Sequence, residues 1–292
     1  MTLVAHAVHE VDRATVQRWL PSLDAWLLPD AFYGVQHTWP QLYRSDGQGR
    51  FFVVTDGDTL LAHCATRVVT VHAGDASFQA CLLGSVATHP GHRGRGLAQA
   101  VLGAALAANA GDAPLTLLWA ERAGLYARAG FHTGREETCL VVARRPHPDL
   151  TGVRPATVAD HIALHTLHEA KPWRVERSLR TFSILLSTPG MTTLVRERDG
   201  AVVAYACCGK GADLQGHWHE LGGSDEDLAV LLPAALHVTG QTDAVVLVPP
   251  WRPRLPALLG PAAVDVGTVP GPMWRATDGG ERACWIDGLD SV

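Results

Sequence analysis

The stretch "GSVATHPGHRGRGLAQAVLGAAL", residues 84–106, decides the fold of this protein. An apolar run comes first, a proline and two arginines among glycines follow, and an alanine-rich segment ends the stretch. This order predicts a strand that ends at residues 86–88, a turn with three glycines, and a helix over about residues 95–110. A strand, a glycine turn and a helix in that order indicate an α/β fold.

The turn in this stretch has the chemistry of an anion site. Backbone N–H groups of the turn and of the helix N terminus would point at one spot. Gly94 and Gly96 permit close approach, and Arg93 and Arg95 add forked, charge-assisted donors that suit phosphate oxygens. No Gly-Lys-Ser/Thr follows, and the glycine spacing is not GxGxxG, so a pyrophosphate fits better than a nucleoside triphosphate or NAD. The structural alternative is a plain glycine turn that caps an alanine-rich helix.

Composition indicates a globular protein of two domains. The chain has 292 residues, of which 47% are hydrophobic and 18% are charged. Since it has no apolar run near the roughly 20 residues that span a bilayer, and no signal-peptide pattern at its start, we expect a cytoplasmic protein without membrane partners. The six cysteines lie mostly in strand-like runs and are expected to be reduced core residues. The net charge of −5 argues against nucleic-acid binding and mildly favours cationic small substrates.

The order of elements repeats along the chain. A proline-rich segment at 143–156 predicts a linker, so we place a boundary near residue 150. Residues 50–71 read as a hairpin that turns at Asp56-Gly57. A strand, the helix, a strand at 115–120, a short helix ending at Gly130 and a strand "TCLVVARR" follow. Residues 192–250 repeat the hairpin, the strand, the glycines, the helix and the strand. We therefore predict an α/β fold of the α+β type, with mixed sheets and two tandem domains, 1–150 and 151–292.

Two motifs of the first domain resemble the GCN5-related N-acetyltransferase (GNAT) superfamily. Arg93, Gly96 and Ala98 fill that family's acetyl-CoA pattern Arg/Gln-x-x-Gly-x-Gly/Ala, and "GLYARAGF" at 124–131 is similar to its Leu-Tyr-x-x-x-Gly-Phe segment. The tandem layout and the run "LLWAERAGLYARAGF" look most like the core of the enhanced-intracellular-survival (Eis) type, known for acetylating aminoglycosides. Two departures are the missing asparagine ahead of the tyrosine helix and a chain short for that subfamily's sterol-carrier-like domain.

The resemblance implies transfer of an acetyl group from acetyl-CoA to a primary amine of a small, cationic acceptor by direct attack, without a metal. Such an amine has a pKa near ~10.4 and must lose a proton before attack, while the thiolate of CoA needs a hydrogen-bond or proton donor. We assign the donor role to Tyr126, and the backbone N–H near Val86 or Ala87 to the acyl oxygen. The alternatives are a non-catalytic acyl-CoA-binding or sensing protein, and an acetyltransferase for protein or amino-acid amines. The expected acetyl-CoA-binding residues are Val86, Ala87, Thr88, Arg93, Gly94, Arg95, Gly96, Leu97, Ala98, Glu121 and Arg122.

The base that deprotonates the amine stays open among Glu121, His37, Glu220 and the carboxylate of Val292. The histidines of "HIALHTLHEA" and "HWH" lack a metal-binding pattern, so we expect no metal site.

The second half departs from the first at the corresponding loop. Where the first half has "HPGHRGRGLA", the second has "GGSDEDLAVL". Three acidic residues would repel a pyrophosphate, so we expect a degenerate second domain without an acetyl-CoA site. This domain should close one wall of an acceptor cleft, and the run "SDED" (224–227) would make that cleft acidic. Helix capping is the plainer explanation of the same run.

Overall fold

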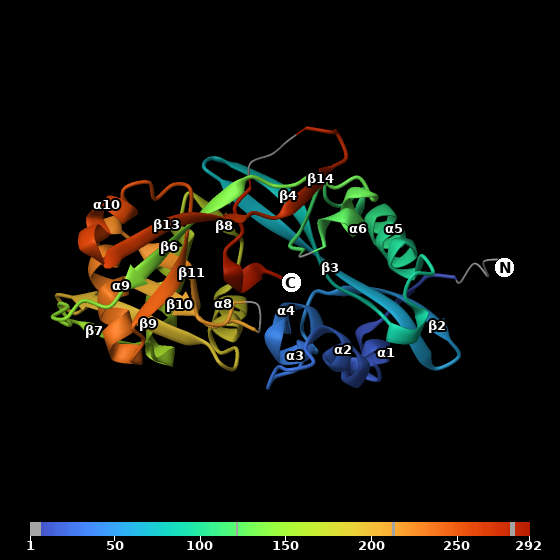
Figure 1. Cartoon of the computed structure of the whole chain (residues 1–292), viewed down its shortest axis with the longest axis horizontal. Helices are drawn as coiled ribbons and strands as arrows, with labels where there is room; N and C mark the ends of the chain where they lie inside the picture. Colours follow the sequence, from blue (N-terminus) through green and yellow to red (C-terminus); the bar gives the residue numbers. More distant parts are fainter. Residues whose placement is uncertain (1–6, 121, 212–213, 281–283) are drawn as a thin grey trace.

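The structure is a computed structural model that describes residues 7–120, 122–211, 214–280 and 284–292. It consists of two mixed sheets, each with helices packed on it, and the C terminus lies between them (Figure 1). No helix in the described part of the chain is long and apolar enough to cross a bilayer. This arrangement confirms the predicted α/β architecture with mixed sheets.

The first sheet contains the hairpin and the strand expected from residues 50–88. Its strand order is β1-β2-β3-β4-β5-β14, and β8 pairs with β3. β4 and β5 are parallel neighbours, while β2, β3 and β4 are antiparallel. The strands of this sheet are β1 (His9–Val11), β2 (Arg50–Asp56), β3 (Thr59–Ala73), β4 (Ala76–Thr88), β5 (Leu115–Leu118), β8 (Trp173–Val175) and β14 (Met273–Ala276).

Helices of the first half cover both faces of this sheet. The predicted helix after the glycine turn is α5 (Leu97–Asn109), and its apolar face buries Val101, Leu102 and Ala105 against the sheet. Spacings of three and four residues place these side chains on one stripe of the helix. The other helices of this half are α1 (Arg13–Gln17), α2 (Leu20–Leu27), α3 (Val35–Thr38), α4 (Pro40–Tyr43) and α6 (Ala123–Ala127), with a 3₁₀ turn η1 (Pro90–His92).

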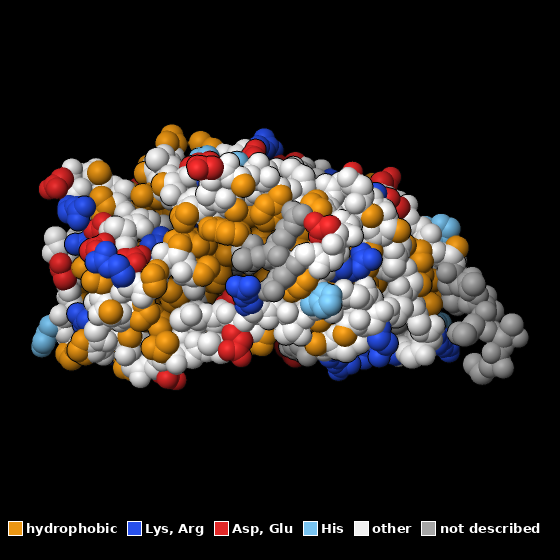
Figure 2. Space-filling model, turned by 90° about the horizontal axis from the view of Figure 1, so that it is seen from above, with side chains coloured by type: hydrophobic (Ala, Val, Ile, Leu, Met, Phe, Trp, Pro, Cys, Tyr) orange, Lys and Arg blue, Asp and Glu red, His pale blue; other side chains and the backbone are white. Residues whose placement is uncertain are grey.

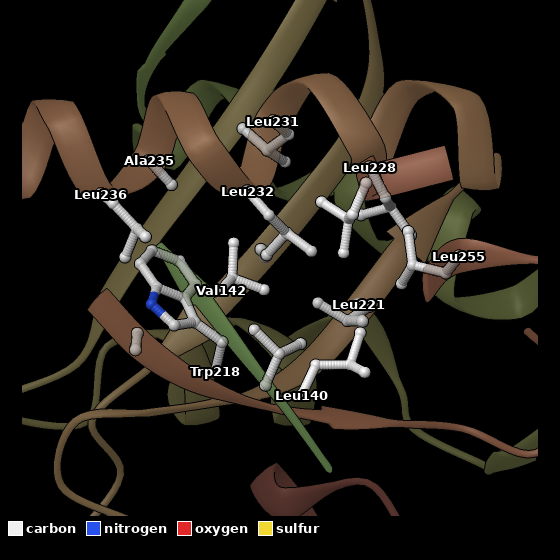
Figure 3. Packing of buried hydrophobic residues seen from close by; sticks show 14 of the residues in the cluster. Leu140, Val142, Trp218, Leu221, Leu228, Leu231, Leu232, Ala235, Leu236 and Leu255 are labelled. Carbon is white, nitrogen blue, oxygen red and sulfur yellow. The ribbon is translucent and has the colours of Figure 1, made fainter. Parts of the chain in front are cut away.

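The second sheet has the order β13-β6-β12-β11-β10-β9-β7. Leucines of α9 and α10 point onto this sheet, where Trp218, Leu221, Leu140 and Val142 meet them (Figure 3). The elements of this half are β6 (Glu136–Ala143), β7 (Val153–Pro155), η2 (Val158–Asp160), α7 (His161–Glu169), α8 (Leu179–Leu186), β9 (Thr192–Arg198), β10 (Ala201–Cys208), β11 (His217–Gly223), α9 (Asp225–Thr239), β12 (Asp243–Val248), α10 (Leu255–Leu259), η3 (Gly260–Ala262), β13 (Ala263–Pro270) and η4 (Gly288–Asp290).

The two halves exchange strands, which the sequence did not indicate. β6 precedes residue 150, yet it pairs with β12 and β13 in the second sheet. β14 follows the second half, yet it pairs antiparallel with β5 in the first sheet. β8, which lies between β7 and β9 in the sequence, also pairs with β3 of the first sheet. The chain therefore crosses between the sheets at residues 132–136, on both sides of β8, and at 270–273, and the two units share one continuous structure.

Candidate active site

The parallel strands β4 and β5 pair and then separate. Their register runs from Ala80 opposite Leu115 to Leu82 opposite Leu117. Beyond that point residues 83–88 of β4 and residues 119–120 line opposite walls of one cleft of about 1020 Å³. The backbone groups of β4 that face this gap lose their ladder partners, so they are available to a ligand.

A bulge shapes β4 at the mouth of the gap. Relative to β3, one extra residue lies between Gly84 and Ala87, and Ser85 within it has a φ of 51°. The His63 ring fixes the bulge, because its Nδ1 lies 2.8 Å from the carbonyl oxygen of Ser85. Burial lowers the pKa of His63 to about 4, so the ring is neutral and Nδ1–H donates to that carbonyl. The bulge thus turns the backbone at Val86 and Ala87, the residues expected to meet the acyl oxygen.

The glycine turn forms one end of the cleft. Gly94 and Gly96 have φ values of 77° and 78°, in the left-handed region that glycine occupies without strain. α5 begins directly after Gly96, which offers no side-chain cap to the first N–H groups of the helix. Those N–H groups and the Arg93 side chain therefore present positive charge to the cleft. Among the described residues that line the cleft, none has a carboxylate side chain to neutralise this charge.

Tyr126 lies on the short helix α6 in the wall of the cleft. Gln99 of α5 donates from Nε2 to the carbonyl oxygen of Leu125 at 2.7 Å, and the Tyr126 ring contacts Phe131 edge-on with centroids 6.1 Å apart. These contacts fix the tyrosine helix against α5. Burial raises the pKa of Tyr126 to about 12, so its hydroxyl keeps its proton throughout the physiological pH range.

Large apolar side chains form the opposite end of the cleft, and sequence patterns gave no signal for them. They come from the end of α2, from the residue after α3 and from the residue after β5. The C-terminal residues complete this wall. Its members are Trp26, Leu27, Leu28, Trp39, Trp119, Ser291 and Val292.

Most of the expected site residues line this one cleft. They are Val86, Ala87, Thr88, Arg93, Gly94, Gly96, Leu97, Ala98, Arg122 and Tyr126. Arg95 is exposed and does not line the cleft, so its expected role stays a prediction. Glu121 lies outside the described residues.

The candidates for the base lie in different places. His37 lines another groove, beside α8. Glu220 is fully buried, and Arg177 and Lys171 hold its carboxylate. Val292 lines the cleft, and its main-chain carboxyl carbon and oxygen contact Gly84 so closely that a Cβ there would lie 2.3 and 2.2 Å from them. Of the described candidates, only Val292 therefore lines the same cleft as Tyr126 and residues 83–88 of β4.

A buried network of charges holds the C-terminal segment in place. Asp290 accepts from Arg67 of β3 at 3.2 Å and from Arg177 at 2.9 and 2.5 Å. Arg177 also donates to both carboxylate oxygens of Glu220, on β11, at 2.7 and 3.0 Å. Because Arg67 belongs to the first sheet and Glu220 to the second, this network fastens both halves to the last residues of the chain.

Two lysines extend the network. Lys171 lies 2.8 Å from Asp287 and 3.1 Å from Glu220. Lys210 donates to the carbonyl oxygens of Gly288, at 3.0 Å, and of Ser291. These side chains hold residues 287–291 in one conformation beside the cleft, because the carboxylates of Asp287 and Asp290 and the carbonyl oxygens of Gly288 and Ser291 all meet buried partners.

His168, one of the histidines for which no metal-binding role was predicted, belongs to this cluster. His168 is buried, its Nε2 lies 2.9 Å from the carbonyl oxygen of Val175, and its Nδ1 lies 3.5 Å from Glu220. Its neighbours Glu220 and Asp287 would suit a metal, but the ammonium group of Lys171 already lies between their carboxylates. We therefore make no metal proposal here.

The acidic run of the second half does not lie in the cleft, which corrects the expectation for "SDED". Ser224 caps α9 by accepting from the N–H of Asp227. Asp225 pairs with Arg252 at 2.7 Å, and Asp227 pairs with Arg196 and Arg198. The run caps a helix and neutralises arginines, so it gives the acceptor cleft no negative charge.

The second sheet also splits beside α9, but the gap is filled. β11 and β12 pair only at His217 and Trp218, opposite Val245 and Val246. Beyond them the Arg252 side chain, 5% exposed, donates to the carbonyl oxygen of Gly223 at 3.0 Å. The Arg252 guanidinium thus bonds the carbonyl oxygens at the end of β11, in keeping with a degenerate second domain.

A mixed sheet that splits between two parallel strands, with a glycine turn and a helix N terminus at the mouth, defines the class as proteins with an N-acetyltransferase fold. Residues 13–134 match the family model described as an acetyltransferase (GNAT) domain. No curated protein matches the sequence. The expected resemblance to the GCN5-related N-acetyltransferases is therefore confirmed.

Solved structures with the same fold extend over both halves of the chain. A protein of unknown function from Enterococcus faecalis V583, described as a probable N-acyltransferase, is similar with a TM-score of 0.74 and 14% identity, over 94% of this chain and 73% of that one. A GCN5-related N-acetyltransferase from Kribbella flavida has a TM-score of 0.67 and 17% identity, over 95% and 73%. Eis1 from Mycobacterium abscessus has a TM-score of 0.63 and 15% identity, over 94% and 74%. These likenesses establish the tandem fold.

Proposed function

We propose that this protein transfers an acetyl group from acetyl-CoA to the primary amine of a small acceptor that is cationic in water. The observation that carries the proposal is the gap between β4 and β5. The turn at Arg93 and Gly96 forms one end of this gap, and Tyr126 lies in its wall. An anion site, a free strand edge and the hydroxyl of the half-buried Tyr126 in one cleft match the three parts of an acyl-CoA: pyrophosphate, pantetheine and thioester.

The cleft fits the cosubstrate in size and charge. Arg93 and the N terminus of α5 supply donors for a pyrophosphate, and Arg122 and Arg128 line the same cleft. The unpaired edge of β4 at residues 83–88 can bond the amide groups of a pantetheine arm, as an added strand would.

The transfer itself needs three kinds of group. The amine nitrogen attacks the thioester carbon, the C–S bond breaks, and an amide and free CoA thiol result. An ammonium acceptor loses two protons in all, of which one reaches the sulfur and one reaches solvent. Backbone N–H groups at Val86 and Ala87 would stabilise the oxyanion, and Tyr126 would donate to the departing sulfur. With a pKa of about 12 Tyr126 is a much weaker acid than a thiol, so its main contribution is a hydrogen bond to the thiolate.

For the base we propose a carboxyl oxygen of Val292. The main-chain carboxyl carbon and oxygen of Val292 lie against Gly84 in the cleft. The negatively charged carboxyl group would attract the ammonium form of the acceptor and then accept a proton from it.

The acceptor end of the cleft supports a particular shape of amine. Trp26, Trp39 and Trp119 line it, and no described lining side chain is a carboxylate. We therefore propose an amine with an apolar or aromatic body, whose single positive charge meets Val292. Among the described residues that line the cleft, the second half contributes Ser291 and Val292. The predicted division, with residues 1–150 binding acetyl-CoA and residues 151–292 shaping the acceptor site, stays a prediction, and so does the cytoplasmic location.

Release of free CoA from acetyl-CoA in the presence of a panel of amines tests the proposal. We expect an arylalkylamine to be acetylated with a higher kcat/KM than a polyamine or an amino acid. Tyr126→Phe should lower kcat about 10²-fold with little change in acetyl-CoA affinity, because a positioned donor contributes roughly 10² to 10⁴. The exposed Tyr33 provides the matched control, and Tyr33→Phe should leave kcat unchanged.

Three outcomes would count against parts of the proposal. Acetyl-CoA binding without acetylation of any amine would favour the sensing function. Wild-type kcat in Tyr126→Phe would leave Tyr126 with a packing role only. A preference for amino acids or polyamines would contradict the apolar acceptor while leaving acetyl transfer in place.

A further inference from the structure

A second cavity lies where the two halves exchange strands. Its volume is about 200 Å³, and residues from β5, β6, β8, β14 and the segments after β12 and before η4 line it. Hydrophobic side chains gather near the middle of the corresponding face of the molecule (Figure 2). We call it the tryptophan cavity, because Trp173, Trp274 and Trp285 line it together with Glu137. Among the described residues, none that lines it also lines the cleft between β4 and β5, which we call the acyl-transfer cleft.

The indole rings of Trp274 and Trp285 contact side chains outside the cavity that fix their orientation. Trp274 stacks on His132, with ring centroids 4.7 Å apart and an interplanar angle of 30°. Trp285 meets Trp251 at 5.9 Å and 83°, and its Nε1 donates to Asp287 Oδ1 at 3.1 Å. These rings therefore present fixed surfaces, which costs a ligand little reorganisation when it binds.

Glu137 differs from its neighbour Glu136. Glu136 is exposed and accepts a hydrogen bond from Thr268 at 2.9 Å. Glu137 is half-buried, and in the described part of the chain no donor or cation lies within bonding distance of its carboxylate. Burial, with a smaller contribution from the charge of Asp287, raises the pKa of Glu137 to about 7. Arg135 lines the same cavity but forms no ion pair with Glu137. A carboxylate removed from water without an ion-pair partner gains from a cationic ligand.

We propose that the tryptophan cavity binds a small organic cation, an alkylated ammonium group, with the indole rings around the cation and the Glu137 carboxylate beside it. Aromatic faces attract ammonium groups through their quadrupoles, and the attraction grows when the site is desolvated. The cavity volume of about 200 Å³ exceeds that of cavities that hold a benzene-sized molecule, and so suits a trimethylalkyl ammonium group. This site is independent of the proposed acetyl transfer, because it shares no residue with that cleft.

Calorimetry of the whole chain with choline, and with its uncharged isostere 3,3-dimethyl-1-butanol, tests the proposal without acetyl-CoA. We expect choline to bind at least about 10-fold more tightly than the alcohol, since only choline gains the cation–π and carboxylate contacts. Glu137→Gln should weaken choline binding about 10-fold or more and leave the alcohol unaffected. Glu226→Gln is the control, because this exposed glutamate does not line the cavity, and it should change neither.

The pH dependence gives a second readout. Choline is charged at every pH, while Glu137 in the free protein is protonated below about pH 7 and ionised above it. Choline affinity should therefore rise between pH 6 and pH 8, and the Glu137→Gln variant should show no such rise. The other ionisable groups near Glu137 are Asp287, Glu136, Arg135 and the Cys284 thiol, and Asp287 is paired with Lys171. Because these groups are unchanged in Glu137→Gln, that variant controls for their titration.

The proposal is overturned if choline and the alcohol bind equally, if Glu137→Gln leaves choline affinity unchanged, or if choline produces no binding heat at tens of millimolar. A parallel titration with acetyl-CoA shows whether each variant is folded, and its result reports on the acyl-transfer cleft alone. Failure of the cation site and failure of the proposed acetyl transfer are thus distinguishable.

Discussion

Replacement of Asp290 by asparagine should destabilise the protein strongly. The Asp290 carboxylate is fully buried and lies between two guanidinium groups, 3.2 Å from Arg67 and 2.5 Å from Arg177 at the nearest atoms. Asparagine keeps the size of the side chain but removes its charge and turns one acceptor into an N–H₂ donor. Arg67 then has no ionic partner among the described residues, and Arg177 retains only Glu220.

The size of the effect follows from the burial of the network. An ion pair broken on one side in the interior typically costs about 3–5 kcal/mol, because the remaining charge stays out of water without compensation. Total stabilities of domains are about 5–15 kcal/mol, so the variant should lose a large share of its stability. The midpoint of thermal unfolding should fall by roughly 6 °C or more.

Thermal and urea unfolding, followed by circular dichroism, measure this loss. The control is Asp58→Asn, which removes one side of an ion pair with Arg18 in which the Asp58 side chain is 98% exposed, and we expect no measurable change. If Asp290→Asn lost no more stability than Asp58→Asn, the buried network would not be what fastens the C-terminal segment to the two sheets.

The loss of stability caused by Asp290→Asn should depend on pH, and the sign of that dependence follows from the pKa of Asp290. Burial by itself would raise the pKa of Asp290, but the charges of Arg177 and Arg67 outweigh it and lower the pKa below its ordinary value. A lowered folded-state pKa gives stability that is complete above the unfolded value of about 3.9 and is lost as pH falls through the folded value. The difference in free energy of unfolding between wild type and Asp290→Asn should therefore become smaller in acid. A difference that grew below pH 4 would contradict this assignment.

Two further predictions concern the cleft. Calorimetry of the wild type should find one acetyl-CoA site per chain, and the double variant Arg93→Glu, Arg95→Glu should abolish binding. A stoichiometry of two, or an unchanged affinity in the double variant, would refute the assignment of acetyl-CoA to this basic turn. Gly84→Ala should lower kcat at least about 10-fold, because the Cβ of the alanine would lie 2.2 Å from the Val292 oxygen and displace it. Gly103→Ala is the control, since no atom lies within 4 Å of a Cβ at that position, and it should leave kcat unchanged. Equal kcat values for the two variants would remove Val292 from the mechanism.

Local patterns were sufficient for the first half of the site. Gly94 and Gly96 were expected in a turn, and both have left-handed backbone. α5 begins after Gly96 as the alanine-rich run predicted, and α6 carries Tyr126 into the same cleft. These features depend on residues within about 45 positions of one another, and on a strand pair whose hydrophobic pattern is strong, so sequence reasoning could find them.

Local sequence patterns could not predict whether acidic side chains line the cleft. The run at 224–227 reads equally well as a cap or as a wall of a cleft, and only the position of Arg196, Arg198 and Arg252 in the fold decides that it is a cap. The apolar wall of Trp26, Trp39 and Trp119 has no motif, because three separate segments supply it.

By itself, the sequence determined the tandem repeat of strand, turn and helix, the basic turn of the first half and its loss in the second. Each of these depends on backbone preferences and charges of neighbouring residues, which act in any context. Only the tertiary structure decided that β6 and β14 change sheets, that Asp290 joins Arg67 to Arg177 across the halves, and that Val292 and Glu137 lie in two separate cavities. Asp290 and Arg67 are 223 positions apart, and a pairing at that separation depends on the register of whole sheets and on the cost of burying charge, neither of which a local pattern records.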